Sequence, residues 1–287
     1  MGLLAKFYLF VSLLGVFSAA AVAQTPTVVL MAGDIAQCNT PGAEQTGQLI
    51  KALPYPVLAL GDLAYPNGST EDFARCYTPH WGSFKDRTYP APGNHEYGTA
   101  QAADYFSYFG ARAGPAGKGY YSFDLGAWHI VSLNSNRELA TDSAQLQWLE
   151  ADLRRHRQRC VLAYWHHPRY SSGPHGTDAR TQAMWAVLHR YGASVVVSGH
   201  DHIYERFAPM DAHGEYDPVR GIRSFIAGTG GAKPYALKQR IALSEAANGE
   251  SWGVLKMTLE ADRYAWEFLP VPGHPFRDAG SAQCVVR

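Results

Sequence analysis

The sequence predicts a layered α/β domain in which helices lie outside paired sheets. Strand-like and helix-like segments alternate along the first two-thirds of the chain, and strands alone follow near its end. No internal repeat, low-complexity linker or shift in composition marks a second domain. Alternating element types are typical of sheets covered by helices, and 287 residues can bury a substantial core.

Each predicted strand is a short apolar segment bounded by polar turns. In chain order the predicted strands are residues 27–32, 56–60, 119–124, 128–133, 161–165, 193–198, 222–227, 253–259 and 264–269. Gly126 is expected to turn the third and fourth strands into a hairpin. A capping-box-like start at Asp142 predicts a helix with leucines at helical spacing, and residues 177–191 predict another.

The first 23 residues are expected to form a signal peptide. Lys6 precedes an apolar run from Phe7 to Phe17, and Ala21-Val22-Ala23 matches a cleavage site. An uncleaved membrane anchor is the alternative, because the run is almost long enough to span a bilayer; the small residues after Phe17 favour cleavage. We therefore expect a secreted or periplasmic location, a single mature domain at 24–287, and no membrane contact after cleavage.

Charge and cysteine content narrow the classes of partner and site. The chain has 25 basic and 25 acidic side chains, so its zero net charge gives no electrostatic basis for binding nucleic acid. Export makes the four cysteines candidates for disulfide bonds, for which three pairings exist. We favour Cys38–Cys76, since each follows one of the first two motifs below, and Cys160–Cys284, which would hold the C-terminal tail.

Five short motifs place a potential metal ligand just after an apolar strand. They are Gly33-Asp34, Gly61-Asp62-Leu63-Ala64-Tyr65, Gly93-Asn94-His95-Glu96, His166-His167-Pro168 and Gly199-His200-Asp201-His202. Strand ends in open α/β sheets share one crevice, so these side chains are expected to converge. Three oxygen and three imidazole donors result, from Asp34, Asp62, Asn94, His166, His200 and His202. That set is too large for one tetrahedral zinc ion and suits two ions that share a bridging carboxylate.

The order of these motifs resembles that of the calcineurin-like metallophosphoesterases over essentially the whole mature chain. The resemblance implies a four-layer α-β-β-α sandwich with two mixed sheets and a metal site at the C-terminal ends of strands. One position departs from the general pattern, because Ala36 stands where the superfamily has a histidine. Tyr65, three residues after Asp62, supplies a donor instead, and this Gly-Asp-x-x-Tyr pattern is similar to that of the purple acid phosphatases.

By this resemblance, two sets of residues hold the two metals. Asp34, Asp62, Tyr65 and His202 are expected at the first, Asp62 bridges, and the second is completed by Asn94, His166 and His200. The alternative for Tyr65 is a turn aromatic. As a ligand, its phenolate has an ordinary pKa near 10 and requires a strong Lewis acid. We therefore expect Fe(III) in the Tyr65 site and Zn, Fe or Mn in the second.

The expected reaction is hydrolysis of phosphate monoesters, in which a hydroxide held by the metals attacks phosphorus. His95 and His175 are the candidate catalytic residues, with His95 as general acid, and the candidate substrate contacts are Asn94, His95 and His175; His175 could instead be a solvated loop residue. Glu96 is expected to orient His95 or to pack within its loop. A phosphodiesterase, nucleotidase or phytase, and a non-catalytic metal- or phosphate-binding protein, are the alternatives. The partner is a phosphoester substrate; its identity and the oligomeric state stay open.

Two further polar features have structural interpretations. Glu205 and Arg206 are expected to form an ion pair that holds the loop of His200 and His202. His129 lies in an apolar strand and is expected to be a hydrogen-bonded core histidine.

Overall fold

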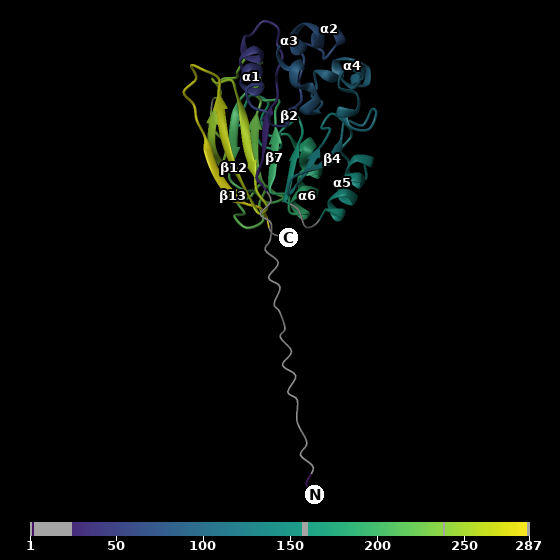
Figure 1. The fold of residues 1–287 in the computed structure, drawn as a ribbon, viewed down its shortest axis with the longest axis vertical. Coiled ribbons are helices and arrows are strands. Elements are labelled where there is room, and N and C mark those ends of the chain that lie inside the picture. Colours follow the sequence, from purple (N-terminus) through teal and green to yellow (C-terminus); the bar gives the residue numbers. More distant parts are fainter. Residues whose placement is uncertain (1, 3–24, 157–159, 238, 286–287) are drawn as a thin grey trace.

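The computed structural model describes residue 2 and residues 25–156, 160–237 and 239–285 (Figure 1). The predicted signal peptide at 1–23 therefore lies outside the described residues, apart from Gly2. Within the described ranges, none of the helices has the length and apolar character that crossing a membrane requires.

Two mixed β-sheets form the centre of the molecule. The first has the strand order β13-β12-β11-β1-β2-β3, in which β1, β2 and β3 run parallel and β11, β12 and β13 are added in antiparallel fashion. Its strands are β1 (Thr27–Ala32), β2 (Val57–Leu60), β3 (Thr88–Ala91), β11 (Gly253–Leu259), β12 (Arg263–Pro270) and β13 (Ala279–Gln283).

The second sheet has the order β10-β8-β9-β7-β6-β5-β4. Its parallel centre consists of β5, β6, β7 and β9, while β4, β8 and β10 pair in antiparallel fashion. Its strands are β4 (Tyr121–Leu125), β5 (Trp128–Ser132), β6 (Cys160–Tyr164), β7 (Val195–Ser198), β8 (Tyr204–Phe207), β9 (Arg223–Ala227) and β10 (Ser244–Asn248).

Helices cover the outer faces of both sheets (Figure 1). The α-helices are α1 (Gly42–Lys51), α2 (Thr70–Asp72), α3 (Thr78–Trp81), α4 (Ala103–Phe109), α5 (Ala144–Arg155) and α6 (Gln182–Arg190). One π-helical turn, η1 (Phe73–Tyr77), joins α2 to α3. Short 3₁₀ turns are η2 (Gly82–Arg87), η3 (Glu96–Gly98), η4 (Ala100–Ala102), η5 (Gly110–Ala113) and η6 (Ala179–Thr181).

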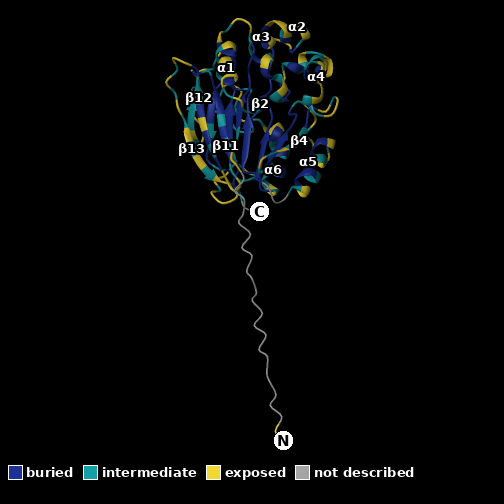
Figure 2. Cartoon of the chain, in the orientation of Figure 1, coloured by how far each residue is buried: buried dark blue, intermediate teal, exposed yellow. Residues whose placement is uncertain are grey.

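Three apolar clusters separate the four layers. Because successive side chains of a strand point to opposite faces, Val29 and Met31 of β1 enter the core between the sheets, whereas Leu30 packs outward under α1, η1, α3 and α4. A third cluster lies between the second sheet and the leucine-bearing faces of α5 and α6. Figure 2 shows the central strands buried and the outer helical surfaces exposed. The expected four-layer α-β-β-α arrangement is confirmed.

All nine predicted strands occur, with ends shifted by at most two residues. The polar edge strand β10, its neighbour β8, the proline-containing β3 and the small-residue strand β13 were not predicted, nor were α1 to α4. The four strands lack a continuous apolar run, and pairing with neighbouring strands determines their structure. The cap of α5 was also wrong: Ser143, not Asp142, accepts from the backbone at the helix start.

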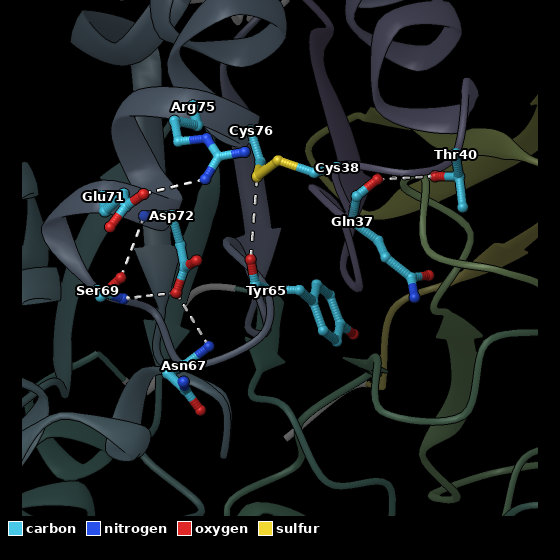
Figure 3. The surroundings of a disulfide bond; sticks show 10 residues. All are labelled: Gln37, Cys38, Thr40, Tyr65, Asn67, Ser69, Glu71, Asp72, Arg75 and Cys76. Carbon is cyan, nitrogen blue, oxygen red and sulfur yellow. Dashed lines mark hydrogen bonds and ion pairs between the residues drawn. A yellow bond between two sulfur atoms is a disulfide. The ribbon is translucent and has the colours of Figure 1, made fainter.

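Two disulfides connect segments distant in sequence. They are Cys38–Cys76 and Cys160–Cys284, the pairs that the sequence favoured. The first ties the loop after β1 to η1 beside Tyr65 (Figure 3). The second ties the start of β6 in one sheet to the residue after β13 in the other, so it links the two sheets.

Candidate metal centre

The five sequence motifs form loops directly after β1, β2, β3, β6 and β7. Three of their candidate ligands have left-handed backbone conformations, with φ of 58° at Asp34, 51° at Asp62 and 71° at His200. Non-glycine residues adopt this region rarely, and such strain concentrates at functional sites. Gly93 has a steric role, because an added Cβ would lie 2.1 Å from Asp62 Oδ1.

The first donor cluster consists of Asp34, Tyr65 and His202 together with one oxygen of Asp62. The Tyr65 hydroxyl lies 3.1 Å from Asp34 Oδ1, 3.1 Å from His202 Nε2 and 3.4 Å from Asp62 Oδ2. His202 Nδ1 is 2.8 Å from the carbonyl oxygen of Lys233. With the ring proton on Nδ1, donated to that carbonyl, the Nε2 lone pair faces the cluster.

The second donor cluster consists of Asn94, His166 and His200 and uses the same oxygen of Asp62. His166 Nε2 is 3.1 Å from Asn94 Oδ1, 3.1 Å from Asp62 Oδ2 and 3.2 Å from His200 Nδ1. On its other side, His166 Nδ1 lies 2.9 Å from the Leu60 carbonyl oxygen, which fixes the ring. Asp62 Oδ2 therefore stands between two donor clusters.

The spacing of these atoms fits metal coordination. Bonds of about 2.0–2.2 Å from a metal to nitrogen or oxygen place neighbouring donors roughly 3 Å apart, as found in both clusters. Asp34, Asp62 and His166 form one group of donor atoms within 4.8 Å of one another. The donor chemistry, carboxylate, phenol, amide and imidazole, is compatible with two cations that share Asp62.

The electrostatics of the site favour bound positive charge. Burial opposes protonation of His166, but the carboxylates of Asp62 and Asp34 outweigh it and raise the pKa of His166 to about 9. Burial lowers the pKa of His202 to about 4, so its ring is a neutral donor at pH 7. Burial and the nearby Asp34 and Asp62 raise the pKa of Tyr65 well above its usual value.

Glu96 holds the backbone of its own loop and of the Asp62 loop, so loop packing, one of the two roles expected for it, is the one observed. Its carboxylate accepts hydrogen bonds from the backbone N–H groups of Asp62 at 2.9 Å, Leu63 at 2.8 Å and Gly93 at 2.7 Å. Burial and the charge of Asp62 raise the pKa of Glu96 to about 7, although these hydrogen bonds oppose the shift. Glu96 thus fixes the backbone that carries Asp62.

His95 lies beside the first donor cluster. Its ring centroid is 4.3 Å from that of Tyr65, and its Nε2 is 3.7 Å from Asp62 Oδ2. The side chain is 34% exposed, so it remains accessible to a substrate. It lines a cavity of about 580 Å³ whose other walls include Gln37, Tyr65, His202, Lys233 and Tyr235.

His175 lies beside the second donor cluster, with its ring centroid 4.2 Å from that of His200. Two buried carboxylates hold its loop: the Asp201 carboxylate accepts from the His175 N–H and the Ser171 hydroxyl, and Glu205 accepts from the Ser172 N–H at 2.8 Å. Glu205 therefore does not form the ion pair with Arg206 that the sequence had predicted.

Arg206 instead pairs with Asp278 and Glu245. His167 belongs to a group of donor atoms with His166 and His200. Its Nδ1 lies 2.8 Å from Ser135 Oγ, and burial lowers the pKa of its ring. The sequence signal for His167 was its position next to His166. No local sequence pattern indicated that Lys233 and Tyr235 would lie at the site.

The fold and this two-cluster site define the class of protein. A family model for calcineurin-like phosphoesterases matches residues 7–204, and the chain belongs to that family.

The curated relatives narrow the resemblance to purple acid phosphatases. Purple acid phosphatase 15 of Arabidopsis thaliana is 28% identical over 251 residues, covering 74% of this chain and 47% of that protein. Purple acid phosphatase 21 of the same plant is 31% identical, covering 64% of this chain and 46% of that protein. Acid phosphatase type 7 of Mus musculus is 28% identical, covering 64% and 50%. The chain spans about half the length of these relatives, and the purple acid phosphatase resemblance drawn from Tyr65 is confirmed.

Solved structures confirm the fold. A purple acid phosphatase from yellow lupin (Lupinus luteus) seeds aligns with a TM-score of 0.70 at 18% identity, covering 91% of this chain and 54% of that one. GAP50, the anchor in the inner membrane complex of Plasmodium, aligns with a TM-score of 0.67 at 12% identity, covering 91% and 89%.

Proposed function

We propose that the protein hydrolyses phosphate monoesters at a dinuclear metal centre. The observation that carries this proposal is the single oxygen, Asp62 Oδ2, shared by two clusters of donor atoms. One cluster would hold the first ion through Asp34, Tyr65 and His202, and the other would hold the second through Asn94, His166 and His200. Purple acid phosphatase relatives support the acid phosphatase reaction.

When bound, the two ions would lower the pKa of a water, supply the nucleophile and neutralise phosphate charge. The chain's own residues would do the rest. His95, partly exposed beside the first cluster, would donate a proton to the leaving oxygen and contact the phosphate. His175, held beside His200 by Asp201, would contact the phosphate from the other side. Asn94 would add an amide contact to the substrate.

Tyr65 supports Fe(III) in the first site. Burial and two carboxylates make its phenolate costly without a metal, because they raise its pKa well above the usual value. A trivalent ion compensates this cost better than a divalent one. The Tyr65 phenolate would contribute three negative charges together with Asp34 and Asp62. Fe(III) and a divalent Zn, Fe or Mn ion would contribute five positive charges. The two positive charges that remain would attract a phosphate dianion.

We further propose cleavage of a signal peptide at residues 1–23, a single mature domain at 24–287, and a secreted or periplasmic location without membrane contact. Two disulfides support this proposal, because such bonds persist in oxidising compartments. Zero net charge supports the absence of nucleic-acid binding.

Removal of one donor from the second cluster tests the proposed function. We expect Asn94→Ala and His166→Ala each to lower kcat/KM on a phosphate monoester by more than about 100-fold, because loss of a residue that only supports a metal ligand already lowers activity by up to about 100-fold. Monoester and diester model substrates should be assayed side by side, with exposed His213→Ala as the control. Undiminished activity in both variants would refute the assignment, and a preference for diesters would change the substrate class.

A further inference from the structure

Lys233 is fixed beside the candidate metal centre by its backbone. Its N–H donates to Gln37 Oε1 at 3.0 Å, and its carbonyl oxygen lies 2.8 Å from Nδ1 of His202, a candidate ligand of the first metal. The neighbouring Tyr235 donates its N–H to the His202 carbonyl at 3.0 Å and stacks on the His202 ring at 4.0 Å. Two contacts of Lys233 and two of Tyr235 therefore fix this segment beside the candidate metal centre.

Lys233 lines the cavity of about 580 Å³ that His95 also lines. This volume is typical of pockets that hold whole small molecules rather than a lone phosphate. The cavity borders Tyr65 and His202 of the first cluster, whereas His166 and His200 do not line it. A phosphate bound across both clusters would therefore direct its ester group toward this cavity, past His95.

The charge of the cavity favours an anion. Among the described residues that line it, none has a carboxylate side chain, and amide side chains of Gln37 and Asn39 lie on the wall with Lys233. No carboxylate of the described chain lies within ion-pair distance of the Lys233 ammonium. In Figure 3 the side chains of Gln37 and Tyr65 extend away from the Cys38–Cys76 disulfide. An unpaired ammonium on a flexible four-carbon stem can meet an anionic group in this space.

We propose that this cavity is a leaving-group subsite in which Lys233 binds a second anionic group, carboxylate or phosphate, on the alcohol part of the substrate. The substrate class is then monoesters with a second negative charge rather than esters of neutral alcohols. This inference rests on the proposed function, and it adds a specificity-determining residue to the same site.

Matched substrates test it directly. Phosphoglycerate and glycerol phosphate share the ester and differ in a carboxylate, and fructose bisphosphate and fructose phosphate differ in a second phosphate. We expect Lys233→Gln to lower kcat/KM on the doubly charged member of each pair by about five-fold or more, the size of one screened charge pair. Activity on the singly charged member should change less than about two-fold. A response in one pair alone would identify which anion the subsite takes.

Two control variants separate charge from structure. Lys233→Arg keeps the charge and should keep the preference, and Lys51→Gln removes an exposed lysine at the end of α1 and should change nothing. Raising the ionic strength should reduce the preference of the unmodified protein but not that of Lys233→Gln, because salt screens exposed charges. The inference would be overturned if Lys233→Gln changed kcat/KM equally for both members of both substrate pairs, or changed it for neither member.

A binding measurement keeps the two proposals separable. Phosphonopropionate and propylphosphonate are not hydrolysed, and they differ in one carboxylate. Calorimetry on the metal-loaded protein should show tighter binding of phosphonopropionate, and Lys233→Gln should remove the difference. If the unmodified protein turned over neither substrate pair, the proposed function would fail, while this comparison would still decide whether Lys233 binds a second anion.

Discussion

At the scale of single residues, Tyr65 lies where it can supply the donor that is absent at Ala36. Its N–H donates to the carbonyl oxygen of Ala36 at 3.0 Å, so the position that lacks histidine and the tyrosine are neighbours. The hydroxyl of Tyr65 lies within 3.1 Å of both Asp34 Oδ1 and His202 Nε2. The donor missing at residue 36 can therefore be supplied from the adjacent loop.

Tyr65→Phe tests the identity of the first metal. We expect the isolated protein to absorb visible light through a phenolate-to-ferric charge-transfer band, and Tyr65→Phe to lose the band and part of its iron. Tyr235→Phe is the matched control, because this tyrosine stacks on the His202 ring and is not one of the donors that form the first cluster. Absorption spectra and elemental analysis give the readout. A colourless unmodified protein that contains only zinc or manganese would contradict the ferric site.

At the scale of elements, the loop 171–175 is held against the metal centre by two carboxylates of the last motif. Asp201 accepts from the Ser171 hydroxyl and the His175 N–H, and Glu205 of β8 accepts from the Ser172 N–H. Gly173 packs so closely that an added Cβ would lie 2.3 Å from the Asp201 carboxyl carbon. His175 therefore keeps its place near His200 through Asp201, which makes Asp201 a positioning residue.

Asp201→Ala should lower kcat by about 10- to 100-fold, because small displacements of a contacting group cost this much. The metal content should stay unchanged, since no candidate ligand is removed. Asp201→Asn keeps one acceptor oxygen and should recover part of the activity. Steady-state kinetics together with elemental analysis distinguish the cases. Loss of metal in parallel with activity would show that Asp201 supports the ligands rather than His175.

At the scale of the whole molecule, His129 connects layers. It is buried in β5, and its two ring nitrogens lie 2.9 Å from Asp124 Oδ1 of β4 and 2.7 Å from Asp152 Oδ2 of α5. The prediction of a hydrogen-bonded core histidine is confirmed. Burial alone would raise the pKa of Asp152, but the hydrogen bond and charge of His129 lower it below the usual value.

This pKa shift predicts how stability depends on pH. A carboxylate whose pKa is lower in the folded state stabilises fully above its unfolded pKa, near 4, and loses that contribution as pH falls through the folded pKa. Asp152→Asn should therefore lower the free energy of unfolding at neutral pH by about 2 kcal/mol, the worth of a hydrogen bond to a charged group, because His129 keeps its contact with Asp124.

Urea denaturation at neutral pH and again below pH ~4 measures this effect. The difference between Asp152→Asn and the unmodified protein should shrink on the acid side, where Asp152 becomes protonated. Asp142→Asn, an exposed site before α5, is the control and should change little. A difference that is independent of pH would show that the pair with His129 does not cause the stabilisation.

The sequence by itself determined the α/β fold class and indicated six of the candidate ligands, because both are written in local patterns; Tyr65 followed from the family resemblance. Apolar segments of strand length gave the centre of each sheet, and donors directly after strands gave the site. It also favoured both disulfide pairs, since Cys38 and Cys76 each follow one of the first two motifs and Cys284 lies close to the C-terminus.

Only the tertiary structure decided the supporting contacts and the edges of the fold. Glu96 holds the backbone of Asp62 across 34 residues, and Lys233 meets Gln37 across 196. Side-chain partners at such separations leave no periodic signal in the sequence, which is why the sequence left two roles open for Glu96 and why the ion pair expected of Glu205 was wrong. For the same reason β8 and β10 escaped prediction: their structure is fixed by neighbouring strands brought together only when the chain folds.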